Sequence, residues 1–311
     1  MTISKAQLNS ATIATGARHS MAYVAEATYG TTPSTPVFIP IRHTSASLAL
    51  SKETLQSEEL RPDRQIAAFK HGNRQVGGDI GAEFSFGSFD DFLEAALCGT
   101  WATNTLKVGI ERRSFTIERI FSDIDQYHRF TGVEVNSLAM SVAPNAMVTA
   151  TFSTVGQSME TDTAIIEGAT YDDATTTTPF DSFSGQITVG GSRSAVVTSV
   201  DFTLENGIEA AFVIGSPDTI RPTIGNSNVT GSMSVYFEDS TLIDNFINED
   251  EVELSFTLDG DDGSYTFTLP RIKFGSGAPE LSGTGPVVIS MEFQALYDGT
   301  EETNLMIERT A

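Results

Sequence analysis

Residues 76–97 read VGGDIGAEFSFGSFDDFLEAAL, and residues 229–248 read VTGSMSVYFEDSTLIDNFIN. In both stretches apolar or small residues alternate with polar ones and then recur at helical spacing, which predicts a half-buried strand followed by a short amphipathic helix. A single offset of 153 positions carries Val76 onto Val229 and relates every later pair. The pairs are Gly78 and Gly231, Ile80 and Met233, Ala82 and Val235, Phe84 and Phe237, Phe89 and Leu242, and Leu93 and Phe246. One structural unit is therefore written twice.

Both predicted helices have a recognisable start. Ser88 is placed to cap a helix over 88–97, with Asp91 three residues later completing a capping box, and Ser240 is placed to cap a helix over 240–248. We expect one apolar face of each helix to be buried. The faces are Phe89, Phe92, Leu93, Ala96 and Leu97 in the first helix, and Leu242, Ile243, Phe246 and Ile247 in the second.

Other segments repeat at different offsets, as expected if loops of unequal length join matched strands. The matches are Leu48 and Leu50 with Phe202 and Leu204, residues 114–117 (SFTI) with 264–267 (SYTF), and residues 148–155 with 289–296, which places Phe152 over Phe293. The predicted fold class is mainly β with short helices (α+β), built as two tandem, similar β-sandwich or barrel domains, each with a flanking helix.

The predicted domain boundaries follow from the repeat and from composition. They are 1–39 for an N-terminal arm, 40–156 for the first β domain, 157–179 for a Thr-rich linker, 180–300 for the second β domain and 301–311 for a C-terminal tail. The long segment 51–75 interrupts the first domain, and a loop of that length inside a compact domain usually has a function.

Charge and composition exclude several classes of protein. With 41 acidic and 18 basic residues the net charge is −23, which disfavours a nucleic-acid-binding surface. The charge is uneven: residues 1–155 carry net −2 and residues 156–311 net −21. This asymmetry suits either two ordinary solvated faces or halves that attract one another between subunits. No apolar run reaches signal-peptide or membrane-span length, so we expect synthesis in the cytoplasm and no membrane partner.

Chemistry-bearing motifs are scarce. His19, His43, His71 and His128 lie at no metal-binding spacing, the single cysteine Cys98 forms no intrachain disulfide, and no nucleophile elbow or phosphate-binding loop occurs. We therefore expect no enzyme activity, no metal and no cofactor. Residues 258–263 superficially resemble an acidic calcium loop, but they join two alternating segments, which favours a hairpin turn.

Three segments carry a resemblance to a known family. They are MAYVAEATYGTTPSTPVFIPI (21–41), VGGDIGAEFSFGSFDDFLEAALCG (76–99), and PFDSFSGQITVGG with VTSVDFTLENG (179–191 and 197–207). Over about residues 18–300 the chain resembles the tail tube proteins of long-tailed, non-contractile bacteriophages.

The resemblance implies a structural virion protein whose β-sandwich or barrel-like units form six-unit rings, and the rings stack into a hollow tube for DNA ejection. Two units in one chain imply a trimeric ring with pseudo-sixfold symmetry. The implied partners are further copies of the chain, a tape measure protein inside, terminator and tip proteins at the ends, and DNA that passes without specific binding. The implied location is the phage tail, after assembly in the host cytoplasm.

Two sets of residues are candidates for function. Arg61, Arg64, Lys70 and Arg74 form a basic segment that either stacks on a neighbouring subunit or is a solvated loop balanced by nearby carboxylates. Asp79, Glu83 and Glu238 are candidates for an acidic lumen that repels DNA phosphates, although alternation alone does not tell the lumen face from the opposite face.

Two other functions compete with this interpretation. A virion or cell-surface β-sandwich that binds carbohydrate or a receptor should expose aromatic side chains, yet Trp101 is the single Trp. A hydrolase needs a convergent carboxylate pair, and no spacing in the sequence supports one.

Overall fold

The structure is a computed structural model that describes residues 13–182, 186–193, 197–280 and 284–311. It is mainly β, with 53% strand and 6% helix. The N-terminal half contains β1 (His19–Ala25), β2 (Val37–Pro40), β3 (Ser45–Ala46), β4 (Ala49–Gln56), β5 (Phe69–Glu83), α2 (Asp90–Leu97), β6 (Thr105–Lys107), β7 (Phe115–Phe121), β8 (Gln126–Val142), β9 (Thr149–Gly156), β10 (Ser158–Asp162) and β11 (Thr170–Tyr171).

The C-terminal half also has a short helix between two sets of strands. It contains β12 (Gln186–Val189), β13 (Ser192–Arg193), β14 (Val197–Glu205), β15 (Glu209–Ala211), β16 (Ile220–Thr223), β17 (Asn228–Tyr236), α3 (Thr241–Ile247), β18 (Val252–Gly260), β19 (Gly263–Phe274), β20 (Ala278–Glu280), β21 (Val288–Ala295) and β22 (Met306–Thr310).

Each half is a sandwich of two layers that share one long strand. In the N-terminal half, β4, β5, β9 and the end of β8 form one layer, and β2, β1, β7, the start of β8 and β10 form the other. In the C-terminal half β19 has the role of β8, pairing with β18 and β22 at its start and with β21 at its end. Apolar side chains fill the space between the layers, because strand side chains alternate between the two faces. Phe84, Phe152, Phe256 and Phe267 are among the most deeply buried.

The strand pairings of the two halves repeat with one register. Ile80 faces Phe152 across β5 and β9, and Met233 faces Met291 across β17 and β21. The irregularities repeat too, since β8 carries one extra residue at Asn136 opposite β9, and the β19–β20 segment carries one extra residue between Phe274 and Ala278 opposite β21.

Two of the sequence matches are corrected by this register. Phe152 corresponds to Met291 rather than to Phe293, because a period-two pattern looks the same after a shift of two residues. The segment 114–117 opens β7, which pairs with β8 as β18 pairs with β19, so its counterpart is β18 and not residues 264–267.

The two halves are joined into one continuous sheet. β14 lies antiparallel beside β8, from Val200 opposite Val142 to Glu205 opposite Ser137. The resulting sheet, here called the long sheet, runs in the order β4, β5, β9, β8, β14, β17, β21 and then β19–β20. It does not close into a barrel within the described residues, so the barrel alternative was wrong.

The helices lie where the repeat predicts them, and Ser240 occupies the N-cap position of α3, but neither Ser88 nor Ser240 makes the predicted side-chain cap bond. α2 begins at Asp90 after Phe89, and the Ser88 hydroxyl bonds instead with the hydroxyls of Ser85 and Thr177. At α3 the cap comes from Asp239, whose carboxylate accepts from the Thr241 N–H at 2.8 Å, and Ser240 makes no side-chain cap bond. The expected apolar face of α2 is buried. The face of α3 is only partly covered, and Ile247 is 67% exposed.

The segments predicted to flank the two domains take part in the sheets. β1, in the expected N-terminal arm, pairs with β7 along its full length, and residues 1–12 lie outside the described part. β10 and β11 of the expected linker pair with β8 and β2. In the expected C-terminal tail, β22 pairs with β19 on one side and with β6 of the other half on the other.

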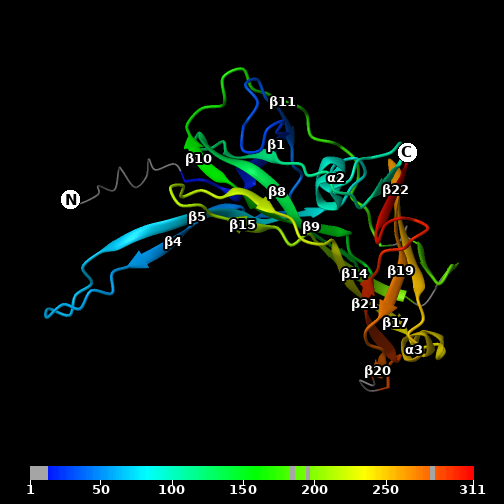
Figure 1. Ribbon diagram of the computed structural model, residues 1–311. Coiled ribbons are helices and arrows are strands. Elements are labelled where there is room, and N and C mark those ends of the chain that lie inside the picture. Colours follow the sequence, from blue (N-terminus) through cyan, green and yellow to red (C-terminus); the bar gives the residue numbers. More distant parts are fainter. Residues whose placement is uncertain (1–12, 183–185, 194–196, 281–283) are drawn as a thin grey trace.

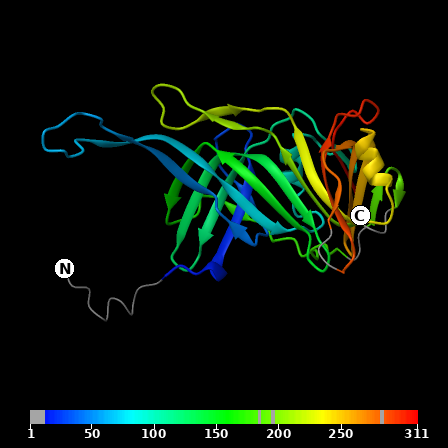
Figure 2. The ribbon, with the colours of Figure 1, turned by 90° about the horizontal axis from the view of Figure 1, so that it is seen from below.

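Two hairpins leave the sheets. β4 and β5 continue beyond the sandwich as a two-stranded ribbon, the β4–β5 ribbon (residues 51–75), which extends far from the rest of the chain (Figure 1). The β15–β16 hairpin (residues 205–228) connects β14 to β17. Both point toward the same side of the molecule (Figure 2).

Candidate functional site

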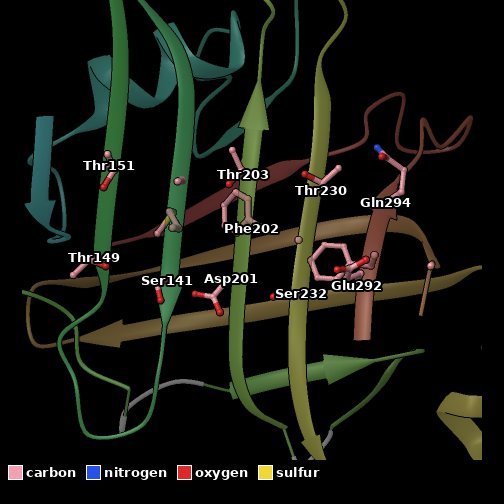
Figure 3. Close-up of a pocket in the computed structure, with 15 residues that line it drawn as sticks. Ser141, Thr149, Thr151, Asp201, Phe202, Thr203, Thr230, Ser232, Glu292 and Gln294 are labelled. Carbon is pink, nitrogen blue, oxygen red and sulfur yellow. The ribbon is translucent and has the colours of Figure 1, made fainter. Parts of the chain in front are cut away.

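The outward face of the long sheet, here called the polar face, is lined by small polar and acidic side chains. They form rows that cross both halves, because residues opposite one another on neighbouring strands project to the same side. One row is Glu83, Thr149, Ser141, Asp201, Ser232 and Glu292, and the next is Gly81, Thr151, Ala139, Thr203, Thr230 and Gln294. Much of both rows lines a shallow hollow of about 610 Å³ at the junction of the halves (Figure 3).

Two of the three acidic candidates lie on this polar face. Asp79 and Glu83 are exposed on β5, and the Ser153 hydroxyl of β9 donates to the Asp79 carboxylate. Glu238 is also exposed, but it lies in the connection between β17 and α3. Asp79 and Glu83 thus share one face, and the assignment of that face to a lumen stays a prediction.

Three further carboxylates on the polar face were missed from the sequence. Asp201 and Glu205 alternate along β14 with the buried Phe202 and Leu204, and Glu292 alternates along β21 with buried neighbours. The alternation of these carboxylates with apolar residues along the sequence is the signal that could have identified them as facing outward. Together with Asp79 and Glu83 they make the polar face acidic across both halves.

The two ends of the long sheet are open edges. The outer edge of β4 and the outer edge of β20 have no strand partner among the described residues. Pro279 in β20 has no N–H to donate, and the Leu48 carbonyl before β4 accepts from Arg119 Nη1 at 2.8 Å. Unpaired strand edges attract further strands, so these edges are candidates for contact with another chain.

The four basic candidates do not form one cluster. Within the ribbon, Arg61 pairs with Asp63, and Arg64 and Lys70 are exposed nearby. At the base of the ribbon, Arg74 instead contacts the β15–β16 hairpin, since its N–H donates to the Pro217 carbonyl at 2.7 Å and its guanidinium lies 3.7 Å from Asp218. Three of the four charges are thus at the projecting end.

The ribbon also exposes apolar side chains. From Ser51 to His71 every residue except Ser57 is exposed. The large apolar residues among them are Leu55, Leu60, Ile66 and Phe69, with Leu60 98% exposed. An apolar surface of this kind on a projecting hairpin usually marks a contact with another chain.

α2 lies at the junction of the halves and is covered from both sides. Its first-turn carboxylates bind Tyr23 of β1 (Asp91, 2.9 Å) and Tyr265 and Arg309 of the C-terminal half (Asp90). Burial, followed by the neighbouring carboxylate, raises the pKa of both tyrosines well above its usual value, so each hydroxyl stays protonated and donates.

The single tryptophan is covered as well. The Arg309 guanidinium lies 4.4 Å from the centre of the Trp101 ring, a cation–π distance. The Trp101 ring is therefore already in contact with a side chain of the same protein.

Three of the four histidines meet at one place, although the sequence showed no spacing for it. His19 Nδ1 lies 2.9 Å from His43 Nε2, Arg119 Nε donates to His19 Nε2 at 3.1 Å, and His128 is nearby. Burial, followed by the charge of Arg119 and then by His43 and His128, lowers the pKa of His19 to about 4. The ring is thus held neutral.

Among the residues that the structure describes, no group of three or more His, Cys, Asp and Glu side chains is placed to hold a metal ion. In that same part of the chain no helix has the length and apolar character needed to cross a membrane.

Residues 16–295 match the sequence model of a family described as phage tail tube protein. No curated protein matches the chain.

Proposed function

The chain belongs to the phage tail tube protein family, and we propose that three copies close into a ring of six similar domains that stacks into the tube. The family match covers residues 16–295. Members of this family are structural virion proteins and not enzymes, and membership suggests self-assembly into a tube. The number of copies, the symmetry and the passage of DNA are the proposed part.

The observation that carries the trimeric ring is the junction between β8 and β14. There the last strand of one domain in the long sheet pairs with the first strand of the next domain. At the two ends of the long sheet, β4 corresponds to β14 and β19–β20 corresponds to β8, and both strands have an open edge. The pairing seen between β8 and β14 can therefore be made between β19–β20 of one chain and β4 of another. Three such contacts and three internal junctions would close a ring of six domains.

The internal junction also predicts the register of the contact between chains. Thr203 of β14 faces Ala139 of β8, and the positions that correspond to them in the repeated pairings are Ala49 and Ala278. In the same register Leu48 faces Pro279, and its carbonyl already accepts from Arg119, so the missing proline N–H leaves no buried acceptor unpaired.

The helices support the same arrangement. α2, at the internal junction, is covered by Tyr265 and Arg309 of the other half. α3 is the counterpart of α2 in the C-terminal half, and the apolar side chains of α3 remain at least partly exposed. A neighbouring chain at this end would cover them.

The polar face is proposed to line the lumen. Its carboxylates, among them Asp79, Asp201 and Glu292, would repel the phosphates of DNA, and its small Ser, Thr and Gly side chains offer little for bases to stack on. DNA would then pass without binding. We assign Glu238 a place at one rim of this lumen, since it follows the end of β17.

The β4–β5 ribbon is proposed to stack rings. Arg61, Arg64 and Lys70 would contact the acidic C-terminal half of a subunit in the next ring, while Arg74 would support the base of the ribbon through the β15–β16 hairpin of its own chain. A tape measure protein inside the tube and terminator and tip proteins at its ends would complete the assembly.

The test combines electron microscopy with a cysteine pair at the proposed contact. Ala49→Cys with Ala278→Cys, both at exposed positions, should give covalent trimers as the largest product after oxidation of assembled tubes. Native Cys98 is buried and does not interfere. Thr203→Cys with Ala139→Cys, the internal counterpart, is the positive control, and Ala49→Cys with Ser276→Cys, two residues out of register, is the negative control. Absence of hollow rings, or covalent products larger than three chains, would contradict the trimeric ring.

A further inference from the structure

The two connections that leave the long sheet are almost equal in length but have different surroundings. Residues 51–75 comprise the outer parts of β4 and β5 with the turn between them, and residues 205–228 run from the end of β14 to the start of β17. The second connection is folded across the end of the N-terminal half, while the first, beyond Arg74 at its base, projects away from the rest of the described chain (Figures 1 and 2). The β15–β16 hairpin therefore has a domain of its own chain beneath it, and the projecting part of the β4–β5 ribbon has none among the described residues.

The β15–β16 hairpin is bound to the N-terminal half along its length. At its start the Asn206 amide donates to the Ala96 carbonyl at the end of α2 at 2.8 Å, and the Ile208 N–H donates to Asn136 at 2.6 Å. Farther along, Arg221 pairs with the buried Glu134, and Arg112 donates to the Pro222 carbonyl.

The far end of this hairpin reaches the base of β5. The Arg74 N–H donates to the Pro217 carbonyl, and the Arg74 guanidinium faces Asp218. The hairpin thus crosses the whole end of the preceding domain, from β8 to β5. Asn206 and Ile208, which make the contacts at the start of the hairpin, are buried.

From this contrast we propose that the β4–β5 ribbon lies across the C-terminal half of the neighbouring subunit in the same ring. Around the proposed ring, the C-terminal half of one subunit is followed by the N-terminal half of the next subunit. Within one subunit, the N-terminal half is followed by the C-terminal half in the same way. The inference rests on the proposed ring and names a second copy of this chain as the partner. It assigns the ribbon a first contact within its own ring, in addition to any contact with the next ring.

The residues that would meet follow from the repeat. Gln65, near the far end of the ribbon, corresponds to Asp218 of the β15–β16 hairpin. Ser227, at the base of β17, corresponds to Arg74 at the base of the ribbon. Lys52 corresponds to Asn206, which contacts the end of α2. Lys52 would therefore face the end of α3 in the neighbouring subunit, where Glu249 and Asp250 lie. A cation beside helix-terminal carbonyls and carboxylates is a favourable arrangement.

The apolar side chains of the ribbon agree with a covered position. Phe69 is 54% exposed and has the place of Pro222, which is buried against the N-terminal half. Leu55, near the other edge of the ribbon, is 57% exposed. Docking on the neighbour would remove these surfaces from water, which is the usual driving force for such a contact.

A cysteine pair distinguishes contact within a ring from contact between rings. Gln65→Cys with Ser227→Cys, treated with a short bifunctional thiol reagent in assembled tubes, should give covalent trimers and nothing larger, because links within a ring close after three chains. A ladder that continues beyond three chains would show that the ribbon reaches the next ring instead and would overturn the inference. Gln65→Cys with Glu238→Cys, at the opposite end of β17, is the matched control and should stay uncrosslinked.

The Ala49–Ala278 pair separates failure of this inference from failure of the ring. Covalent trimers from that pair, with no product from Gln65 and Ser227, would leave the ring standing and overturn the docking of the ribbon. No product from either pair would overturn both. As a second test, Lys52→Glu should lower the yield of tubes at least threefold, and adding Glu249→Lys should restore most of it. Equal yields from wild type and Lys52→Glu would contradict the assigned Lys52 contact.

Discussion

Arg221 Nη2 lies 2.9 Å from Oε1 of Glu134, a carboxylate that is only 2% exposed. Arg112 occupies the other oxygen of the same carboxylate. Replacing Glu134 by Gln would leave two guanidinium groups without a charged partner, and loss of one member of a buried ion pair costs about 3 kcal/mol. We expect Glu134→Gln to lower the free energy of unfolding by about that amount in urea titrations. The exposed Glu160→Gln is the control and should change it by less than about 0.5 kcal/mol.

The same position of the two repeats, Gly78 and Gly231, requires a glycine because of close packing. A Cβ on Gly231 would overlap the Phe293 ring and the Asp201 carbonyl, and one on Gly78, at φ +147°, would lie 2.6 Å from the Leu48 nitrogen. Gly231→Ala should therefore destabilise the chain by about 2 kcal/mol, as overpacking of a core does. Thermal unfolding measures the effect. Gly299→Ala, where no atom lies within 4 Å, should leave the midpoint within about one degree, and equal shifts for both variants would contradict the packing argument.

The sequence predicted which elements exist better than where their partners lie. The apolar face of α2 is a local feature, so residues such as Phe92 and Leu93 were correctly predicted to be buried. The match of Phe152 with Phe293 failed because alternation does not fix register to better than two residues. The caps failed because Ser88 is engaged by Ser85 and Thr177, a partner that lies far along the chain.

The candidate site was predictable only in part for the same reason. Asp79 and Glu83 share a strand, so their common face follows from spacing. Asp201 and Glu292 join that face only through the pairing of β8 with β14 and of β17 with β21. The meeting of His19 with His43 also depends on contacts between segments that the sequence does not relate.

The neutral state of His19 predicts how stability depends on pH. Burial of the ring, followed by the positive charge of Arg119, which donates to Nε2, lowers the pKa of His19 to about 4. Above about pH 6.5, the ordinary value, the ring is neutral in both the folded and unfolded states. As the pH falls from there toward 4, the unfolded state takes up a proton that the folded state refuses, so the free energy of unfolding decreases.

Replacement of His19 isolates this contribution. His19→Gln should flatten the dependence of the melting temperature on pH between 6.5 and 4. His71→Gln, on the exposed ribbon, should leave the wild-type slope unchanged. A wild-type slope in the His19 variant would show that other groups cause the acid sensitivity.

The acidity of the polar face predicts the behaviour of DNA. Asp201→Lys with Glu292→Lys places two positive charges in one row of the proposed lumen. Tubes should still form, but short duplex DNA should be retained at 50 mM salt and released at 200 mM, because phosphate contacts weaken with salt. Sedimentation of tubes with labelled DNA measures this. Asp244→Lys with Asp261→Lys, on α3 and the β18–β19 turn, adds the same charge elsewhere, and equal retention by this control would argue against an acidic lumen.

The projecting charges of the ribbon can be tested apart from its base. Arg61→Glu, Arg64→Glu and Lys70→Glu together should leave a folded chain, because these side chains are exposed and Arg61 pairs only with Asp63 of the same loop. Arg74 is left unchanged, since it holds the β15–β16 hairpin through Pro217 and Asp218. If the three charges contact the acidic half of a subunit in the next ring, the variant should form single rings that fail to stack in electron micrographs. Reversal of Glu53, Glu58 and Glu59 on the same ribbon should leave stacking intact, and normal tubes from the Arg and Lys variant would place the ring-to-ring contact elsewhere.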